Sequence, residues 1–448
     1  MIPFLIKHVV YPVHGIATGR PILKCAAELE KTQWLSHEEL AELQWRKLRS
    51  VLSHAAEKVP YYRRAFGEAG VDVGKFTSPQ DLARLPVLTK AVIRANQSDL
   101  IGEGASMSRL KQGSSSGSTG ENVVFYHDAN CRGNFLGAVV RNHRWCGADV
   151  GELEVRIWGS AFDLSSAARW TGRLKSLLQN VRFISAYELK PDLMAKFTDD
   201  LRKWKPAIIT AYAVAAEVFA KYLLEHGISD IRPKGVICSA EALFPHQREV
   251  IESAFGCKVF NRYGCREFGD IAQECDQGGF HVNMERVFVE VVPEDGCPEG
   301  LEPGELLVTD LDNYGMPMIR YRIGDIASHE DPAVKCECGR GLVMLREVQG
   351  RTMDAIRTSS GRVLPGTFWT ILTKSVPGIV QFQIVQKDLT HIVLNLKTDK
   401  TFPRDSIPSL EETVKGYCGA ETCVDINLVD HIEPGPSGKF RFVISELQ

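Results

Sequence analysis

Residues 128–251 carry a regular alternation of helical and strand patterns, and this alternation limits the folds open to the chain. Helical segments and short strand-like segments follow one another along this region. Two helices and three strands are predicted there, at 191–204 and 214–226 and at 154–158, 207–210 and 235–239. Such alternation predicts an α/β fold, in which helices cover a sheet.

The flanking segments predict further units. Residues 281–328 combine closely spaced strand patterns with turn signals, which indicates a β-rich subdomain. The C-terminal part has a separate α+β pattern, with strands predicted at 381–386, 391–397, 424–428 and 441–445. A chain of 448 residues is long enough for two or three units. We expect a large domain at 1–350 and a small one at 351–448.

Two local patterns stand upstream of the alternating region. Apolar residues at helical spacing predict a helix over 36–66, and Ser36 with Glu39 predicts a capping box at its start. Residues 1–15 are apolar but interrupted by Lys7, His8 and Pro12, and they lack the features of a signal peptide. We interpret them as a folded segment or a packing arm, with weak attachment to a membrane surface as an alternative.

Composition excludes several classes of protein. The formal net charge of -3 argues against a nucleic-acid partner, because phosphate neutralisation needs a basic surface. No segment has the roughly 18 continuous apolar residues of an integral membrane helix. The twelve cysteines are spread along the chain, which favours reduced thiols in the cytoplasm over a disulfide framework. The sequence is compatible with a homodimer.

Residues 113–120 read GSSSGSTG, a composition that lets backbone N–H groups turn toward an anion while hydroxyls add donors. The Walker pattern GxxxxGK[ST] is absent, and a flexible surface linker is the alternative. The run resembles the signature loop [ST]SG[ST]TG of the adenylate-forming enzymes, most closely in their phenylacetate–CoA ligase and CapK-like branch. The resemblance assigns nucleotide binding to Ser115, Ser116, Gly117, Ser118, Thr119 and Gly120. One departure is Glu121, where relatives often carry a lysine nearby.

Further segments match the same family in the same order, so the resemblance covers nearly the whole chain. The family places a turn against the adenine and a YGxxE motif near the base, and its glutamate holds Mg²⁺. The resemblance carries these roles to Ser239, Ala240 and Glu241, to Asn261, Arg262, Tyr263 and Gly264, and to Glu267. One or two carboxylates beside phosphate oxygens suit Mg²⁺. Taken alone, YGxxE is better explained by a Tyr-Gly turn followed by a solvated glutamate.

The C-terminal motifs complete the match. Asp325, in YRIGD, resembles the family's ribose-binding aspartate, since a carboxylate can accept from both hydroxyls; a turn cap is its alternative. Arg351 stands in GRTMD, which resembles the hinge between a large domain and a small mobile one, and the resemblance puts Arg351 near the nucleotide. Lys439 resembles the lysine that enters the active site for adenylation, although an isolated lysine is ordinarily a solvated charge.

The resemblance implies an acid–thiol ligase that uses ATP, Mg²⁺ and coenzyme A. A carboxylic acid would attack the α-phosphorus of ATP to give an acyl-AMP, with Lys439 and Glu267 as catalytic residues. The small domain would then rotate, and the thiol of coenzyme A would take the acyl group. The same adenylation with another acceptor, in capsule or secondary-metabolite synthesis, is the alternative. A retired relative that only binds nucleotide is a second alternative, encouraged by Glu121.

The acid is expected to contact four residues, Trp158, Phe162, Tyr212 and Ala213. Bulky aromatic walls favour an aryl or short acyl acid over a long chain, and core aromatics are the alternative. Two pairs of soft ligands flank the β-rich segment: Cys275 with His281, and Cys336 with Cys338. Four such ligands suit a structural Zn²⁺ site, and similar residues in related ligases favour it over buried, inert cysteines.

Overall fold

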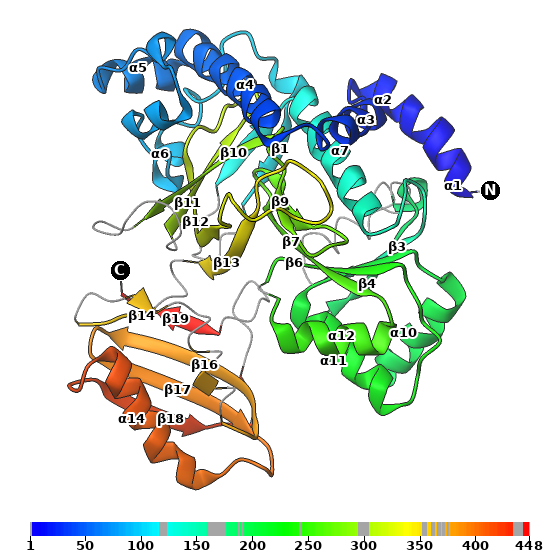
Figure 1. Ribbon diagram of the computed structural model, residues 1–448, viewed down its shortest axis with the longest axis vertical. Coiled ribbons are helices and arrows are strands. Elements are labelled where there is room, and N and C mark those ends of the chain that lie inside the picture. The colour runs from blue at the N-terminus through cyan, green and yellow to red at the C-terminus, as the bar shows by residue number, and fades with distance from the viewer. Residues whose placement is uncertain are drawn as a thin grey trace. The chain divides into compact units, whose positions relative to one another are not determined.

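The chain folds into two compact units in the computed structural model (Figure 1). One comprises Met1–Ile323 with Ser328–Glu347, and the other comprises Gly324–Ala327 with Val348–Gln448. The structure describes residues 2–447 except 116–122, 159–175, 187–188, 190, 242, 294–303, 352–355, 360–362, 365–368, 370–371, 374–375 and 433–441. Side chains are also not described at 191–192, 349–351 and 363. Among the described helices, none has the length and apolarity needed to cross a bilayer.

A seven-stranded sheet forms the centre of the first unit, in the order β4-β3-β5-β6-β7-β8-β9. The first five strands of that order run parallel, and the last two are antiparallel additions. The strands are β3 (Glu154–Trp158), β4 (Val181–Ser185), β5 (Ile208–Ala211), β6 (Gly235–Ser239), β7 (Lys258–Cys265), β8 (Gly269–Glu274) and β9 (Phe280–Val282). The sheet predicted from the alternating pattern is therefore confirmed.

Both faces of this sheet are covered at β6, which explains why that strand is apolar from Gly235 to Cys238. Val236 and Cys238 of β6 face a core that also holds residues of helices α10 (Pro191–Trp204), α11 (Ala213–Glu225) and α12 (Pro245–Phe255). The intervening Ile237 lies in a second core with Cys146 and Ala148, just after helix α7 (Ala129–Trp145). Successive strand residues point to opposite faces, so β6 buries side chains on both sides of the sheet.

Two smaller sheets flank the central one. Strands β1 (Lys111–Ser114) and β2 (Val124–His127) form an antiparallel hairpin around the Gly/Ser/Thr run. A four-stranded sheet has the order β10-β11-β12-β13, as expected for a β-rich subdomain. Its strands are β10 (Val287–Pro293), β11 (Gly304–Asp310), β12 (Tyr321–His329) and β13 (Leu345–Arg351).

The N-terminal part is helical, with one correction to the prediction. The expected helix over 36–66 is two helices, α4 (His37–Lys58) and α5 (Pro60–Glu68). Pro60 cannot donate a backbone hydrogen bond and disfavours helical conformation at Val59, so the chain bends there. The predicted capping box is confirmed: Glu39 N donates to Ser36 Oγ at 3.2 Å, and Ser36 N donates to Glu39 Oε2 at 2.8 Å.

The second unit is built on a four-stranded sheet in the order β18-β17-β16-β19. Its strands are β16 (Ile379–Asp388), β17 (His391–Thr398), β18 (Cys423–Leu428) and β19 (Val443–Ser445), with helix α14 (Ile407–Cys418) between β17 and β18. Trp369, Ile384, Leu394 and Val414 lie in its core and are fully buried. Each of the four strands predicted from sequence is present, within about two residues at each end. A functional boundary between residues 350 and 351 stays a prediction.

Candidate active site

Four parallel strands of the central sheet end at the same edge, and several of the predicted site residues stand there. Ile157 of β3 lies opposite Ala211 of β5, which lies opposite Cys238 of β6. β7 continues past Arg262, the partner of Ser239. The carboxyl ends of parallel strands form the usual ligand edge of an open α/β sheet, because the loops that follow them converge there.

The root of the Gly/Ser/Thr run is held by the β1–β2 hairpin. Ser115 N donates to Val123 O, and Val123 N donates to Ser115 Oγ, both at 2.9 Å. Gly113 is required, since a Cβ there would lie 2.3 Å from the Phe125 ring. Ser115 is buried, with its oxygen engaged inside the hairpin. Ser116, Gly117, Ser118, Thr119 and Gly120 lie outside the described residues.

Glu267 lies in the turn between β7 and β8, and two bonds join its neighbourhood to the hairpin. His127 Nε2 donates to Glu267 O at 2.6 Å, across 140 residues of sequence. Arg266 donates to Ser114 O at 3.4 Å, next to the root of the run. Two motifs that are far apart in sequence are therefore fastened together.

The Glu267 carboxylate is buried among neutral groups. Tyr321 donates its hydroxyl to Oε1 at 3.5 Å, and within the described part of the chain Glu267 enters no ion pair. Burial, followed by the charge of Glu267, raises the pKa of the Cys265 thiol well above its ordinary value. Burial lowers the pKa of His127 to about 4, so its ring is neutral at pH 7 and carries its proton on Nε2 to reach the carbonyl.

Strand β7 places the remaining residues of the YGxxE motif. Asn261 N donates to Glu274 Oε2 at 2.7 Å, and Arg262 Nε lies 3.8 Å from Asp270 Oδ1. The β7–β8 register shifts between Tyr263 and Gly264. A Cβ on Gly264 would lie 2.1 Å from the Gly269 carbonyl oxygen, so the motif glycine allows the two strands to approach.

The turn after β6 has a strained backbone. Ala240 has φ of 68°, in the left-handed region that non-glycine residues rarely adopt. Glu241 Oε2 accepts from Val214 N at 3.3 Å, which joins this turn to the start of α11. Ser239 is buried. Backbone strain is concentrated at functional sites in many proteins, and here it falls where the resemblance puts an adenine-facing turn.

The aromatic residues expected to line the acid site are close together. The rings of Trp158 and Tyr212 are 4.4 Å apart at 40° and pack against the core of the sheet. Tyr212 and Ala213 are buried. Phe162 lies outside the described residues. Both a wall and a core role therefore stay open for this pair.

Of the three predicted C-terminal site residues, Asp325 is the one whose side chain the structure describes. Asp325 is a half-buried residue of β12, in the stretch Gly324–Ala327 that belongs to the second unit. Arg351 ends β13, and its side chain is not described. Lys439 lies outside the described residues.

Three residues of the site were missed from sequence. Arg266 and Tyr321 stand inside the matched motifs, so their positions gave a signal that was not used. His127 gave none, because one histidine at the end of a short strand is common. Only the fold brings its ring to the Glu267 carbonyl.

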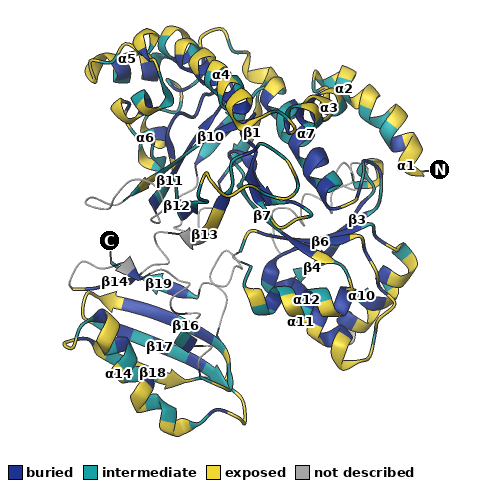
Figure 2. Cartoon of the chain, viewed as in Figure 1, coloured by how far each residue is buried: buried dark blue, intermediate teal, exposed yellow. Residues whose placement is uncertain are grey.

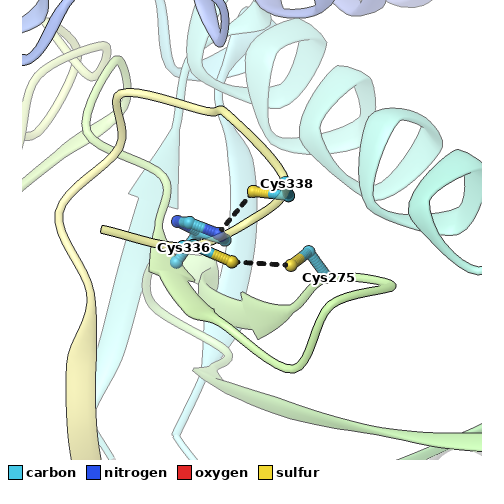
Figure 3. Close-up of side chains that lie close together, drawn as sticks. Cys275, Cys336 and Cys338 are labelled. Carbon is cyan, nitrogen blue, oxygen red and sulfur yellow. Dashed lines mark hydrogen bonds between the residues drawn. The ribbon is translucent and has the colours of Figure 1, made fainter. Parts of the chain in front are cut away.

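The four residues expected to bind zinc lie together in the first unit (Figure 3). Their ligand atoms are all within 4.8 Å of one another. Cys275 Sγ lies 3.6 Å from Cys336 Sγ, and Cys338 Sγ lies 3.2 Å from His281 Nε2. His281 Nδ1 is 3.3 Å from Leu342 O, which directs Nε2 toward the sulfurs.

Two other groups of donor residues occur in the described chain. In the first, His127, Cys131 and Asp310 already have partners: the ring bonds Glu267 O, the thiol bonds Asp310, and Asp310 Oδ1 accepts from two backbone N–H groups. In the second, His391, Cys423 and Asp425 lie at the surface of the second unit, with His391 Nε2 2.8 Å from Asp425 Oδ2. The cluster around Cys275 combines four soft or borderline ligands, of which Cys275 and His281 are buried and Cys336 and Cys338 are half-buried.

Comparison with known proteins gives consistent matches. Residues 356–446 match the model of the CapK C-terminal domain. The chain is 24% identical to protein CapK of Staphylococcus aureus over 417 residues, covering 92% of this chain and 90% of the relative. It is 27% identical to phenylacetate-coenzyme A ligase of Thermus thermophilus over 361 residues, covering 78% and 79%.

Solved structures show the same fold. The crystal structure of 2-hydroxyisobutyryl-CoA ligase in the postadenylation state, in complex with R3-HIB-AMP, superposes with a TM-score of 0.72 at 19% identity. The superposition covers 93% of this chain and 92% of that one. ATP-bound MatB from Rhodopseudomonas palustris gives a TM-score of 0.52 at 16% identity, covering 74% and 66%. The resemblance indicated by the motifs is confirmed: this chain is a relative of the CapK and phenylacetate-coenzyme A ligase proteins, with the fold of the adenylate-forming coenzyme A ligases.

Proposed function

We propose that this chain uses ATP to convert a carboxylic acid into an acyl-AMP and then transfers the acyl group to coenzyme A. The observation that carries the proposal is the fastening of the Gly/Ser/Thr hairpin to the Glu267 turn through His127 and Arg266. The root of a loop suited to phosphates, at Ser114 and Ser115, is thereby held near a carboxylate suited to their cation at the ligand edge of the sheet. The similarity to named coenzyme A ligases supports the same reaction.

In the first step, a carboxylate oxygen of the acid forms a bond to the α-phosphorus while the bond from that phosphorus to pyrophosphate breaks. Two anions must approach each other, so the site must supply positive charge. We assign part of that charge to Arg266, whose guanidinium lies beside the root of the loop. Lys439 would supply the rest by resemblance.

Magnesium fits the environment of Glu267. The carboxylate is buried, faces neutral O–H and S–H groups, and enters no described ion pair, so a buried negative charge lacks compensation there. Glu267 would hold the ion, which would neutralise phosphate charge when bound. His127 holds the backbone of Glu267 in place, which would fix the position of the carboxylate.

In the second step, the thiol of coenzyme A attacks the acyl carbonyl, and AMP leaves with the electrons of the broken C–O bond. We infer that Lys439 serves only the first step. Lys439→Ala should lower acid-dependent adenylation about 100-fold or more and spare thioester formation from a supplied acyl-adenylate. Equal loss of both half-reactions would contradict this division.

We propose an aryl or short acyl acid. The rings of Trp158 and Tyr212 adjoin at the carboxyl ends of β3 and β5, and bulky aromatic walls suit an aryl or short acyl acid. Exchange of labelled pyrophosphate into ATP, measured with aryl, hydroxy-aryl, amino-aryl and short aliphatic acids, tests this range. Exchange supported best by long-chain acids would overturn it.

We also propose one structural Zn²⁺ per chain, held by Cys275, His281, Cys336 and Cys338. The donors fit: Zn–S bonds of about 2.3 Å in a tetrahedral site put two sulfurs about 3.8 Å apart, close to the separation found. Gly279 closes over the cluster, where a Cβ would lie 2.6 Å from Cys336 Sγ. With four protein ligands, the ion would stabilise the fold and leave no position for substrate.

Metal analysis of the purified chain tests the zinc proposal. One equivalent of zinc is expected, with loss of the metal and lower thermal stability in Cys336→Ser. Cys257→Ser, a half-buried cysteine outside the cluster, is the control and should keep the metal. Zinc retained by Cys336→Ser, or lost only from His391→Ala, would contradict the assignment.

A different acceptor is the alternative for the second step, and the similarity to CapK favours keeping it. AMP release that requires coenzyme A supports the ligase, whereas release that requires an amine or a carrier protein supports the alternative. We place the reaction in the cytoplasm, since the described cysteines form no disulfides. A homodimer stays a prediction, to be checked by sedimentation.

A further inference from the structure

Three potential metal ligands meet on the sheet of the second unit. His391 begins β17 and Cys423 begins β18, and the two residues are paired directly in parallel register. Asp425 follows Cys423 by two residues, so its side chain leaves the same face of β18. One ligand atom from each of the three residues lies within 4.8 Å of the other two. These three residues are here called the edge cluster.

Hydrogen bonds hold the backbone around the edge cluster. Cys423 N donates to Thr390 O at 2.7 Å, which fixes the start of β18 beside the start of β17. Thr390 N donates in turn to Asp388 Oδ1 at 2.8 Å, in the turn that leads from β16 into β17. The strands that carry the ligands are therefore already ordered, so binding an ion would cost little conformational entropy.

An ion pair accounts for two of the three side chains. His391 Nε2 lies 2.8 Å from Asp425 Oδ2, and both side chains are partly exposed. An exposed pair of this kind contributes little stability on its own. The thiol of Cys423 is exposed and has no hydrogen-bond partner within the described part of the chain. Lys415, whose charge reaches Cys423, is itself paired with Glu411 at 2.7 Å.

The donor set selects the class of ion. A thiolate, an imidazole and a carboxylate together suit Zn²⁺ and related transition metals, whereas Mg²⁺ and Ca²⁺ prefer oxygen ligands alone. Around a tetrahedral Zn²⁺ the ligand atoms lie about 3.3 to 3.6 Å apart. The ion would therefore replace the proton between His391 and Asp425 and widen their contact by about half an ångström. The thiol of Cys423 would release its proton to solvent on binding.

We propose that the edge cluster binds one exchangeable Zn²⁺, which joins β18 to β17 and keeps a fourth coordination position open. Strand β18 is at the edge of the sheet, where it pairs with β17 on one side and is exposed at Cys423, Asp425 and Asn427 (Figure 2). An ion that binds the paired strands but not the unfolded chain stabilises them. Because this site has three exposed ligands, a chelator removes its ion and leaves the closed Cys275 cluster filled.

Cobalt titration of the full chain tests the proposal. Co²⁺ occupies zinc sites and gives a near-ultraviolet charge-transfer band when a thiolate binds it. The wild-type chain, treated with a chelator and dialysed, should show a band that Cys423→Ser lacks, and Zn²⁺ but not excess Mg²⁺ should abolish this difference. His391→Gln and Asp425→Asn should each weaken cobalt binding at least about tenfold. Asn427→Ala, on the same face of β18, is the matched control and should bind as the wild type does.

Alkylation of Cys423 by iodoacetamide, followed by mass spectrometry of its peptide, gives a second readout that does not depend on enzymatic activity. Zn²⁺ should slow this alkylation at least about tenfold in the wild type and far less in Asp425→Asn. Thermal melting verifies that the variants are folded. Equal cobalt bands in the wild type and Cys423→Ser, or alkylation of Cys423 that Zn²⁺ does not slow, would overturn the proposal.

Discussion

Two buried glutamates stand at opposite edges of the central sheet, and they have very different surroundings. Glu154 begins β3 at the amino edge, and an arginine neutralises its charge. Both of its carboxylate oxygens accept from Arg156 at 2.8 Å, and Oε1 also accepts from Thr210 at 2.7 Å. Glu267 lies at the carboxyl edge, with the Tyr321 hydroxyl at 3.5 Å as a neutral partner. Both residues are less than a tenth exposed.

The difference distinguishes a structural carboxylate, which is neutralised by an arginine, from a carboxylate that, within the described chain, is free of such a partner and can bind a cation. Burial alone would raise the pKa of Glu154, but the Arg156 guanidinium holds it below its ordinary value, so the ion pair contributes to stability. A carboxylate buried without such compensation costs stability, and proteins retain that cost at functional sites. Glu267 has the surroundings expected of a cation ligand.

The largest effect is expected from Glu267→Gln. Acid-dependent exchange of pyrophosphate into ATP should fall about 100-fold, or about 2.7 kcal/mol in activation free energy, because the amide cannot hold the cation that neutralises the phosphates. The free energy of unfolding should stay within about 1 kcal/mol of the wild type or rise, since an amide is cheaper to bury. Denaturant titration and the exchange assay measure the two quantities. If Glu267→Gln lowered the free energy of unfolding by as much as it raised the activation free energy, Glu267 would be a structural carboxylate like Glu154.

Glu154→Gln is the matched change at the other edge. It should lower the free energy of unfolding by about 2 kcal/mol, because it leaves Arg156 without its charged partner. Pyrophosphate exchange at a temperature well below the unfolding midpoint should match the wild type. If pyrophosphate exchange fell as far in Glu154→Gln as in Glu267→Gln, Glu154 would not have a purely structural role.

The stability that His127 contributes at the Glu267 edge depends on pH. Its pKa is about 4 in the folded chain and about 6.5 when unfolded, so between these values the unfolded state binds more protons. Stability contributed by this group is therefore complete above the unfolded pKa and is lost as the pH falls toward 4. His127→Gln, whose amide can still donate to the Glu267 carbonyl, should reduce the slope of unfolding free energy against pH by up to about 1.4 kcal/mol per unit. An unchanged slope in denaturant titrations across this range would show that the ring is solvated.

The smallest effect concerns the strained turn at the same edge as Glu267. Ala240→Gly should raise the free energy of unfolding by less than about 1 kcal/mol, because glycine adopts the left-handed conformation without strain. If the strain holds the turn against the nucleotide, the KM for ATP should rise while stability improves. Destabilisation by glycine would mean that the unfolded chain gains more from the substitution than the turn does.

Much of the fold was predictable because the central strands are covered on both faces. The segment 235–238 is therefore continuously apolar and easily distinguished from an amphipathic helix, whereas 154–158 alternates the paired Glu154 and Arg156 with apolar residues. The break at Pro60 was also signalled, by a residue type that ends helices, although the periodicity on either side concealed it. The four residues predicted as zinc ligands lie together in the fold, since short turns hold each pair, and their binding of zinc stays a prediction.

The site was less predictable, because its decisive contacts are long-range. No local pattern shows that the ring of His127 reaches a carbonyl 140 residues away, or that Arg266 contacts the hairpin. Charge compensation is equally hidden: Glu154 and Glu267 are both single glutamates near strand ends, and only the folded structure gives one an arginine and the other a hydroxyl. The roles of the loop, Asp325 and Lys439 depend on resemblance and stay predictions.

The central claim is that the Glu267 edge activates a carboxylic acid with ATP. Exchange of labelled pyrophosphate into ATP, measured with and without each acid of the panel on wild type, Glu267→Gln and Glu154→Gln, tests it most directly. We expect exchange that depends on an aryl or short acyl acid, that is nearly lost in Glu267→Gln and that is kept in Glu154→Gln. Exchange absent with every acid, or unaffected by Glu267→Gln, would contradict the claim.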